Sequence, residues 1–120
     1  MTSDQYQIAE IDWDDRDIPI SRKFNDPYFS LENGLEETRH VFLGGNRLPG
    51  RFKPDFHIAE LGFGSGLNLL ATWHLWRTNG NQSPLHFTSF EAFPMAASDM
   101  EKSLRAFPEL ADLSRELLQH

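Results

Sequence analysis

The chain has 120 residues and a formal net charge of −7, and 39% of its residues are hydrophobic, which suits one compact domain. It contains no cysteine, which excludes disulfides, thiolate metal sites and cysteine nucleophiles. The acidic balance disfavours a broad nucleic-acid surface, and no apolar run approaches the roughly 20 residues that a membrane-spanning helix needs. The N-terminus shows no signal-peptide pattern, so we expect a cytoplasmic protein.

Residues 1–54 are predicted to form an extension that precedes the main α/β unit. A loose alternation of apolar residues over 5–13 indicates a short edge strand. Residues 18–24 are predicted to be extended, because a proline keeps its predecessor out of the helical region. The Asn-Asp-Pro sequence at 25–27 is a turn signal.

A short helix is expected at about residues 33–44. Asn33 is the predicted N-cap, since asparagine side chains accept hydrogen bonds from the first free N–H groups of a helix. Gly44 and Gly45 are predicted to end the helix in the left-handed conformation. Residues 47–54 then form a basic linker that contains proline and glycine.

Residues 55–120 are predicted to alternate between strands and helices, which favours a parallel sheet. Apolar residues at spacings of three and four, such as Leu69, Leu70, Trp73 and Trp76, give the first helix one buried face. The expected elements are an apolar strand that reaches Glu60, a helix over 67–77, a strand over 85–91, a helix over about 95–107 and another helix that starts at Pro108.

Glycines at every second position follow the first of these strands, at Gly62, Gly64 and Gly66. A glycine-rich turn between a strand and a helix is typical of nucleotide-binding corners in α/β proteins. A dinucleotide site has the pattern G-x-G-x-x-G, which requires a third glycine at position 67 or 69. Leu67 and Leu69 stand there, so the turn does not fit a dinucleotide site.

The pattern Glu-x-Gly-x-Gly-x-Gly resembles the first motif of class I S-adenosylmethionine-dependent methyltransferases. In that family the glycines border the methionine and ribose moieties of the cofactor, and the acid helps to fix its amino group. The resemblance implies S-adenosylmethionine as the cofactor. The candidate cofactor-binding residues are Glu60, Gly62, Phe63, Gly64, Ser65, Gly66, Asn68 and Glu91.

Glu91 ends the next strand, 31 residues after Glu60. Neighbouring parallel strands would place both carboxylates at the carboxyl edge of the sheet, where ligands of open α/β sheets bind. Glu60 is suited to accept from the ammonium group, directly or through water. Glu91 is suited to accept from both ribose hydroxyls, and Asn68 is a further polar candidate in the first helical turn.

The remaining aromatic and basic residues are interpreted as structural. Tyr28, Phe29, Trp73 and Trp76 are favoured as core residues over residues that stack on an adenine. The five histidines show no metal-ligand pairing at helical spacing, so no metal site is predicted. The scattered arginines and lysines are interpreted as ordinary surface charge.

Longer strings narrow the resemblance to one family. Together they are similar to the methyltransferase domain of the MnmC family, which acts in bacterial tRNA 5-methylaminomethyl-2-thiouridine biosynthesis. The similarity runs from about Pro19 to the last helix, and the helix motif around Glu36 is more specific than the glycine turn. The strings that carry it are residues 19–22 (PISR), 26–30 (DPYFS), 32–46 (ENGLEETRHVFLGGN), 60–68 (ELGFGSGLN) and 85–91 (LHFTSFE).

This resemblance implies the N-terminal part of a Rossmann-like methyltransferase fold, with an N-terminal extension and an incomplete parallel sheet. The substrate it implies is a tRNA wobble uridine, whose 5-aminomethyl group becomes 5-methylaminomethyl. Many family members also carry an FAD-dependent oxidase domain, which is not present in these residues. Ser65 stands where the family often has threonine, and this change keeps the hydroxyl group.

The family's methyltransferase domain continues through further strands, including an Asp-x-Phe-x-Pro segment that borders the reacting amine. That segment does not occur here, so no catalytic base is assigned and the chain alone is expected to be inactive. A half-sheet leaves apolar edges open, which predicts a homodimer or an exchange of elements between copies. The alternative function is a truncated, non-catalytic module that binds the cofactor or a protein partner.

Overall fold

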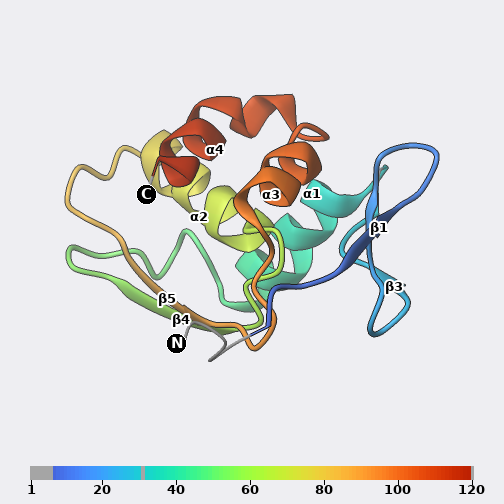
Figure 1. The fold of residues 1–120 in the computed structure, drawn as a ribbon. Coiled ribbons are helices and arrows are strands. Elements are labelled where there is room, and N and C mark those ends of the chain that lie inside the picture. Colours follow the sequence, from blue (N-terminus) through green and yellow to red (C-terminus); the bar gives the residue numbers. More distant parts are fainter. Residues whose placement is uncertain (1–6, 31, 120) are drawn as a thin grey trace.

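The computed structural model describes residues 7–30 and 32–119. A parallel pair of strands lies beneath a layer of helices, and a small antiparallel sheet lies at one side of the molecule (Figure 1). Among the described residues, no helix combines the length and the apolar character that a membrane span requires.

The small sheet contains the strands β1 (Ile11–Trp13), β2 (Pro19–Ser21) and β3 (Asp26–Pro27), which pair antiparallel in that order. The extended segment predicted over residues 18–24 therefore ends at Ser21. The chain turns just before β3, where Asn25 takes a positive φ of 56°. The strand predicted over 5–13 is shorter than expected, and its residues 5 and 6 lie outside the described part of the chain.

The predicted helix consists of α1 (Gly34–Glu37), which continues as a π-helix, η1 (Thr38–Gly44). The side chain of Asn33 makes no capping hydrogen bond, so this part of the N-cap prediction is wrong. The main chain supplies the bond instead, because the Gly34 N–H donates to the carbonyl of Ser30 at 2.7 Å.

The prediction that glycine ends this helix in the left-handed conformation is also wrong. Gly45 keeps a helical φ of −61°, and Arg47 takes the positive φ of 57°. The last turn is closed by other donors. The Asn46 side-chain amide donates to the carbonyl of Phe42 at 2.6 Å, and the Leu48 N–H donates to the carbonyl of Leu43 at 2.9 Å.

The second half has the predicted order of strand, helix, strand, helix and helix, and its two strands are parallel. The strands pair in register from His57 opposite His86 to Leu61 opposite Phe90. The elements are β4 (His57–Leu61), α2 (Leu67–Thr78), β5 (His86–Phe90), α3 (Ala97–Leu104), η2 (Pro108–Leu110) and α4 (Ala111–Leu118). The helix expected over 95–107 is therefore shorter at both ends.

The buried hydrophobic core lies among the helices. Leu70 and Trp76 of α2 are buried as predicted, whereas Leu69 and Trp73 are half-buried. The buried stripe of α2 instead includes Leu67, Ala71 and Thr72. This shift follows from packing, because α2 contacts η1, η2 and α4 on several sides, and a one-sided helical pattern does not describe such a position.

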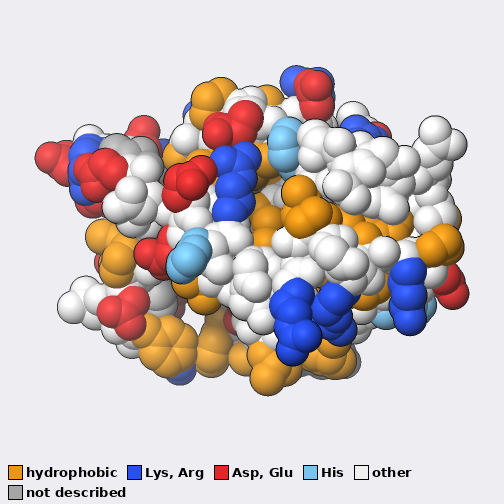
Figure 2. Space-filling view, turned by 180° about the vertical axis from the view of Figure 1, so that it is seen from behind, with side chains coloured by type: hydrophobic (Ala, Val, Ile, Leu, Met, Phe, Trp, Pro, Cys, Tyr) orange, Lys and Arg blue, Asp and Glu red, His pale blue; other side chains and the backbone are white. Residues whose placement is uncertain are grey.

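The outer face of the β4–β5 pair is open among the described residues. Side chains along a strand alternate between the two faces, so Glu60 points toward the helices while its neighbour Leu61 points away from them. Glu60 is only 7% exposed, whereas Leu61 is 88% and Phe90 64% exposed. Hydrophobic side chains accordingly line the lower edge of the molecule in Figure 2, where Figure 1 places this sheet.

Candidate functional site

The glycine-rich turn leaves the carboxyl end of β4 in a conformation that L-residues with side chains rarely adopt. Gly62, Gly64 and Gly66 have φ values of 86°, 58° and 90°. The turn is fastened to the neighbouring strand, because the Gly62 N–H donates to the carbonyl of Phe90 at 2.7 Å. The sequence prediction of a sharp glycine turn between strand and helix is thus realised in the structure.

The two ends of this turn differ in the space around them. A Cβ atom on Gly66 would lie 3.1 Å from the Phe63 ring and 3.3 Å from Leu117, so a side chain there would crowd both neighbours, which would have to shift by a few tenths of an ångström. A Cβ atom on Gly62 would meet nothing within 4 Å. The turn is therefore packed against the protein where the helix begins and open beside the strand end, where a ligand has room to lie against the main chain.

Glu60 is held at the buried side of the turn. Its carboxylate accepts hydrogen bonds from Asn68 Nδ2 and from Ser89 Oγ, each at 2.9 Å. Burial raises the pKa of Glu60, and the nearby charge of Glu91 raises this pKa further, while the two hydrogen bonds oppose the shift. Two of the candidates, Glu60 and Asn68, therefore form one network, with a fixed orientation for the carboxylate.

Glu91 follows β5 and reaches back to the glycine turn. Its Oε1 accepts from the Gly64 N–H at 2.9 Å, and its Oε2 accepts from the Phe93 N–H at 3.1 Å. The sequence predicted that Glu60 and Glu91 lie at the same edge of the sheet, and the structure brings them there. Glu91 additionally connects the turn to the segment after β5, which the sequence did not indicate.

The other candidates lie within the turn itself. Ser65 is buried at 4% exposure, and Phe63 is half-buried with its ring against Gly66. Ser89 was missed by the sequence analysis. The available signal was its position, because Ser89 is the direct cross-strand partner of Glu60 in the parallel register.

A cavity of about 480 Å³ lies beside Glu91, between the small sheet and the segment that follows β5. Tyr28 and Phe93 are among its lining residues. Burial raises the pKa of Tyr28, and the charges of Glu91 and Asp99 add to this effect. Tyr28 was predicted as a core residue. It does pack against the core, but it also forms part of this cavity wall.

Phe29 and Trp76 are core residues, as the sequence predicted. Phe29 is buried and packs edge to face against Phe107, with ring centroids 4.9 Å apart. Trp76 is 3% exposed and donates from Nε1 to the carbonyl of Ser83 at 2.9 Å. Neither ring is available to stack on a ligand.

No protein-family model matches the chain. Curated relatives do match, and the following three bear the name tRNA 5-methylaminomethyl-2-thiouridine biosynthesis bifunctional protein MnmC. The protein from Acinetobacter baylyi is 50% identical, and the match covers 98% of this chain and 20% of the relative. The relative from Leptospira borgpetersenii is 48% identical over 90% of this chain and 17% of its own length. The relative from Aeromonas hydrophila is 45% identical over 99% of this chain and 19% of its own length.

A solved structure is also similar, the crystal structure of MNMC2 from Aquifex aeolicus. Its TM-score is 0.53 at 25% sequence identity, and the match covers 87% of this chain and 39% of that one.

The parallel strand pair, the helices that cover it and the glycine turn define a partial Rossmann-like α/β fold. The sequence identity between this chain and the named relatives extends over nearly all of the chain's length. The chain is therefore a homologue of the MnmC proteins, and it spans about one fifth of the length of the curated relatives that it matches. The predicted fold class and the predicted resemblance to the MnmC family are both confirmed.

Proposed function

We propose that this chain is the cofactor-binding part of an S-adenosylmethionine-dependent tRNA methyltransferase of the MnmC type. The observation that carries the proposal is the convergence of Glu60 and Glu91 on one glycine turn, which has open space beside Gly62. The proposed cofactor unit is residues 55–120. Residues 1–54 form an extension that supplies part of the cavity wall next to Glu91.

The residues at the turn fit the polar groups of this cofactor. Glu60 already has two donors that fix its orientation, and its free lone pairs suit an ammonium group, directly or through water. Glu91 has two carboxylate oxygens on the side of the turn, which suit a pair of ribose hydroxyls. To accept from such a diol, Glu91 must release at least the N–H of Gly64. When bound, the cofactor supplies the methyl group.

The proposed reaction on tRNA converts a 5-aminomethyl group of the wobble uridine to 5-methylaminomethyl. The name of the relatives supports a tRNA substrate, because 5-methylaminomethyl-2-thiouridine is a tRNA nucleoside. Methylation of an amine depends mainly on alignment of the neutral amine with the methyl group. The described residues at the turn contribute orientation of the cofactor, and none of them is assigned to the acceptor.

Calorimetric titration with S-adenosylhomocysteine tests the proposed cofactor site. We expect one molecule bound per chain. Glu91→Ala should weaken binding by about tenfold to a hundredfold, since a hydrogen bond to a charged group contributes about 1.5–3 kcal/mol. The matched control is Glu109→Ala, which removes an exposed glutamate of η2 and should leave the affinity unchanged. An unchanged affinity in Glu91→Ala would remove Glu91 from the site.

A methyl-transfer assay with tRNA that carries 5-aminomethyluridine then separates an enzyme from a module that only binds. The open outer face of the sheet, with Leu61 and Phe90 exposed, favours an interaction role as the second candidate. We propose a second copy of the chain as the partner for this face, because exposed apolar residues on a strand pair favour association of identical surfaces.

A further inference from the structure

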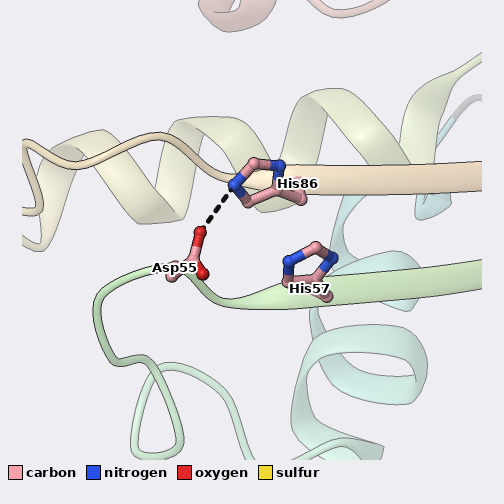
Figure 3. A group of neighbouring side chains, drawn as sticks. All are labelled: Asp55, His57 and His86. Atoms are coloured by element: carbon pink, nitrogen blue, oxygen red, sulfur yellow. Dashed lines mark hydrogen bonds and ion pairs between the residues drawn. The ribbon is translucent and has the colours of Figure 1, made fainter.

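Three potential metal ligands lie together at the amino ends of β4 and β5, opposite to the end that carries the glycine turn. Asp55 stands just before β4, His57 is the first residue of β4, and His86 is the first residue of β5. One ligand atom from each residue lies within 4.8 Å of the other two. Figure 3 shows a nitrogen of each imidazole ring on the side of Asp55.

The strand register brings the two histidines together. His57 and His86 are direct partners in the parallel register, and their rings stack with centroids 4.3 Å apart and an interplanar angle of 8°. The main chain reinforces this pairing, because the His86 N–H donates to the carbonyl of Phe56 at 3.0 Å. Phe56 itself is buried at 8% exposure, so it anchors the segment between Asp55 and His57.

The carboxylate is directed at one of the two rings. Asp55 Oδ1 lies 2.9 Å from His86 Nε2, and Asp55 has a positive φ of 63°. A histidine–aspartate pair of this kind also forms on protein surfaces without any ion. The third group distinguishes this cluster, because the His57 ring brings a second imidazole nitrogen to the same side.

We propose that Asp55, His57 and His86 bind a divalent transition-metal ion of the zinc class. Two imidazoles and one carboxylate are a ligand set that zinc accepts, with water in the fourth position. Neighbouring ligand atoms in a tetrahedral zinc site are roughly 3.3 Å apart, because zinc–nitrogen and zinc–oxygen distances are about 2.0–2.2 Å. Coordination requires the two stacked rings to turn toward a common point and the ligand atoms to approach one another, and all three side chains are half-exposed or more, so the core does not block this movement.

An ion at this position would link two segments that are distant in the sequence, since 31 residues separate Asp55 from His86. The link closes the amino end of the parallel pair, whereas Glu60 and Glu91 occupy its carboxyl end. The proposed ion therefore has a structural role, and it is independent of the proposed cofactor site. Binding to the folded state alone stabilises that state by mass action.

Titration of the untagged chain with ZnCl₂ tests the site, and Co²⁺ provides a visible spectrum for the same ligand set. We expect one ion per chain, and at least about tenfold weaker binding in His57→Ala and in His86→Ala, because each removes one of three protein ligands. The matched control is His40→Ala, which removes an exposed histidine of η1 outside the cluster. This variant should bind zinc like the parent chain.

Thermal unfolding gives a second readout. Zinc should raise the melting midpoint of the parent chain and of His40→Ala, and it should leave that of His86→Ala unchanged. Asp55→Asn keeps a group of the same size and removes the charge, so it should weaken zinc binding without a change in the far-ultraviolet circular dichroism spectrum. S-adenosylhomocysteine affinity should be the same with and without zinc.

Equal zinc affinity in the parent chain, His57→Ala and His86→Ala would overturn the proposed site, as would equal loss of affinity in His40→Ala. Competition between zinc and S-adenosylhomocysteine would also contradict it, because the ion would then bind at the carboxyl end. Failure of S-adenosylhomocysteine to bind at all would leave the zinc result standing and would count against the proposed cofactor site only.

Discussion

The two ends of the β4–β5 pair are built in opposite ways. At the carboxyl end, the polar groups of Glu60 and Glu91 accept hydrogen bonds from main-chain and side-chain donors within the protein. At the amino end, His57 and Asp55 are exposed and His86 is half-exposed. One hydrogen bond joins Asp55 and His86. The carboxyl end is thus preorganised and internally satisfied, whereas the amino end is open to solvent and adjustable.

This difference affects what each end requires of a ligand. A ligand at the carboxyl end has to replace an internal bond between Glu91 and Gly64, so part of its binding energy offsets that loss. An ion at the amino end displaces solvent and reorients exposed side chains. The cost of this exchange disfavours ligands that cannot replace the lost bond at the carboxyl end, and accessibility favours simple ion binding at the amino end.

The largest expected effect concerns the backbone of the carboxyl end. Gly66→Ala should lower the free energy of unfolding by about 2–5 kcal/mol, because the left-handed conformation costs about 1–2 kcal/mol and crowding against Phe63 and Leu117 about 1–3 kcal/mol. Gly62→Ala is the matched control, since it shares the positive φ but has open space. It should lose only about 1–2 kcal/mol. Urea denaturation measures both, and equal losses would contradict the described packing of Gly66.

A smaller effect is expected from the buried carboxylate. The pKa of Glu60 lies above its ordinary value of 4.5 in the folded state, so the folded state holds this proton more tightly than the unfolded state. This tighter proton binding stabilises the folded state. The stabilisation is fully present below about pH 4.5 and is lost as the pH rises through the raised pKa of Glu60. The free energy of unfolding of the parent chain should therefore fall, relative to that of Glu60→Gln, between pH 4.5 and neutral pH.

Denaturant titrations of both proteins at several pH values give this difference directly, because the other titrating groups are common to both chains. A difference that stays constant, or that grows in favour of the parent chain toward neutral pH, would show that burial does not dominate at Glu60.

The smallest effect on stability is expected on the outer face of the sheet, which extends between the two ends. The double variant Leu61→Ser/Phe90→Ser should change the free energy of unfolding by no more than about 0.5 kcal/mol per site, because both side chains are exposed. Sedimentation should nevertheless show weaker self-association than in the parent chain. A parent chain that remains monomeric at high concentration would contradict the proposal that a second copy covers this face.

Much of the carboxyl end was predictable from the sequence. The glycine spacing, the apolar run before it and the acid at the end of each strand are local signals, and parallel pairing follows from the alternation of strands and helices. Glu60, Asn68 and Glu91 could therefore be brought to one edge before the structure was known. The bonds from Glu91 to Gly64 and Phe93 could not, because side-chain rotamers depend on tertiary packing.

The amino end was not predictable in the same way. The histidines were compared only at helical spacing, whereas His57 and His86 meet because they begin two paired strands. That relation depends on the strand register, which a one-residue shift would change. The π-helical turn of η1 and its closure by Asn46 were missed for a similar reason, since the local sequence also fits an ordinary helix with a glycine end.

The two-stranded parallel sheet has a consequence for the exchange of amide hydrogens. Among residues 7–30 and 32–119, β4 and β5 pair only with each other, so each strand directs alternate N–H groups away from its partner. Adjacent amides along each strand should then differ sharply in protection, with slow and fast exchange in alternation. A strand added from another copy would slow the fast set alone, so the exchange pattern reports which edge of the sheet is covered.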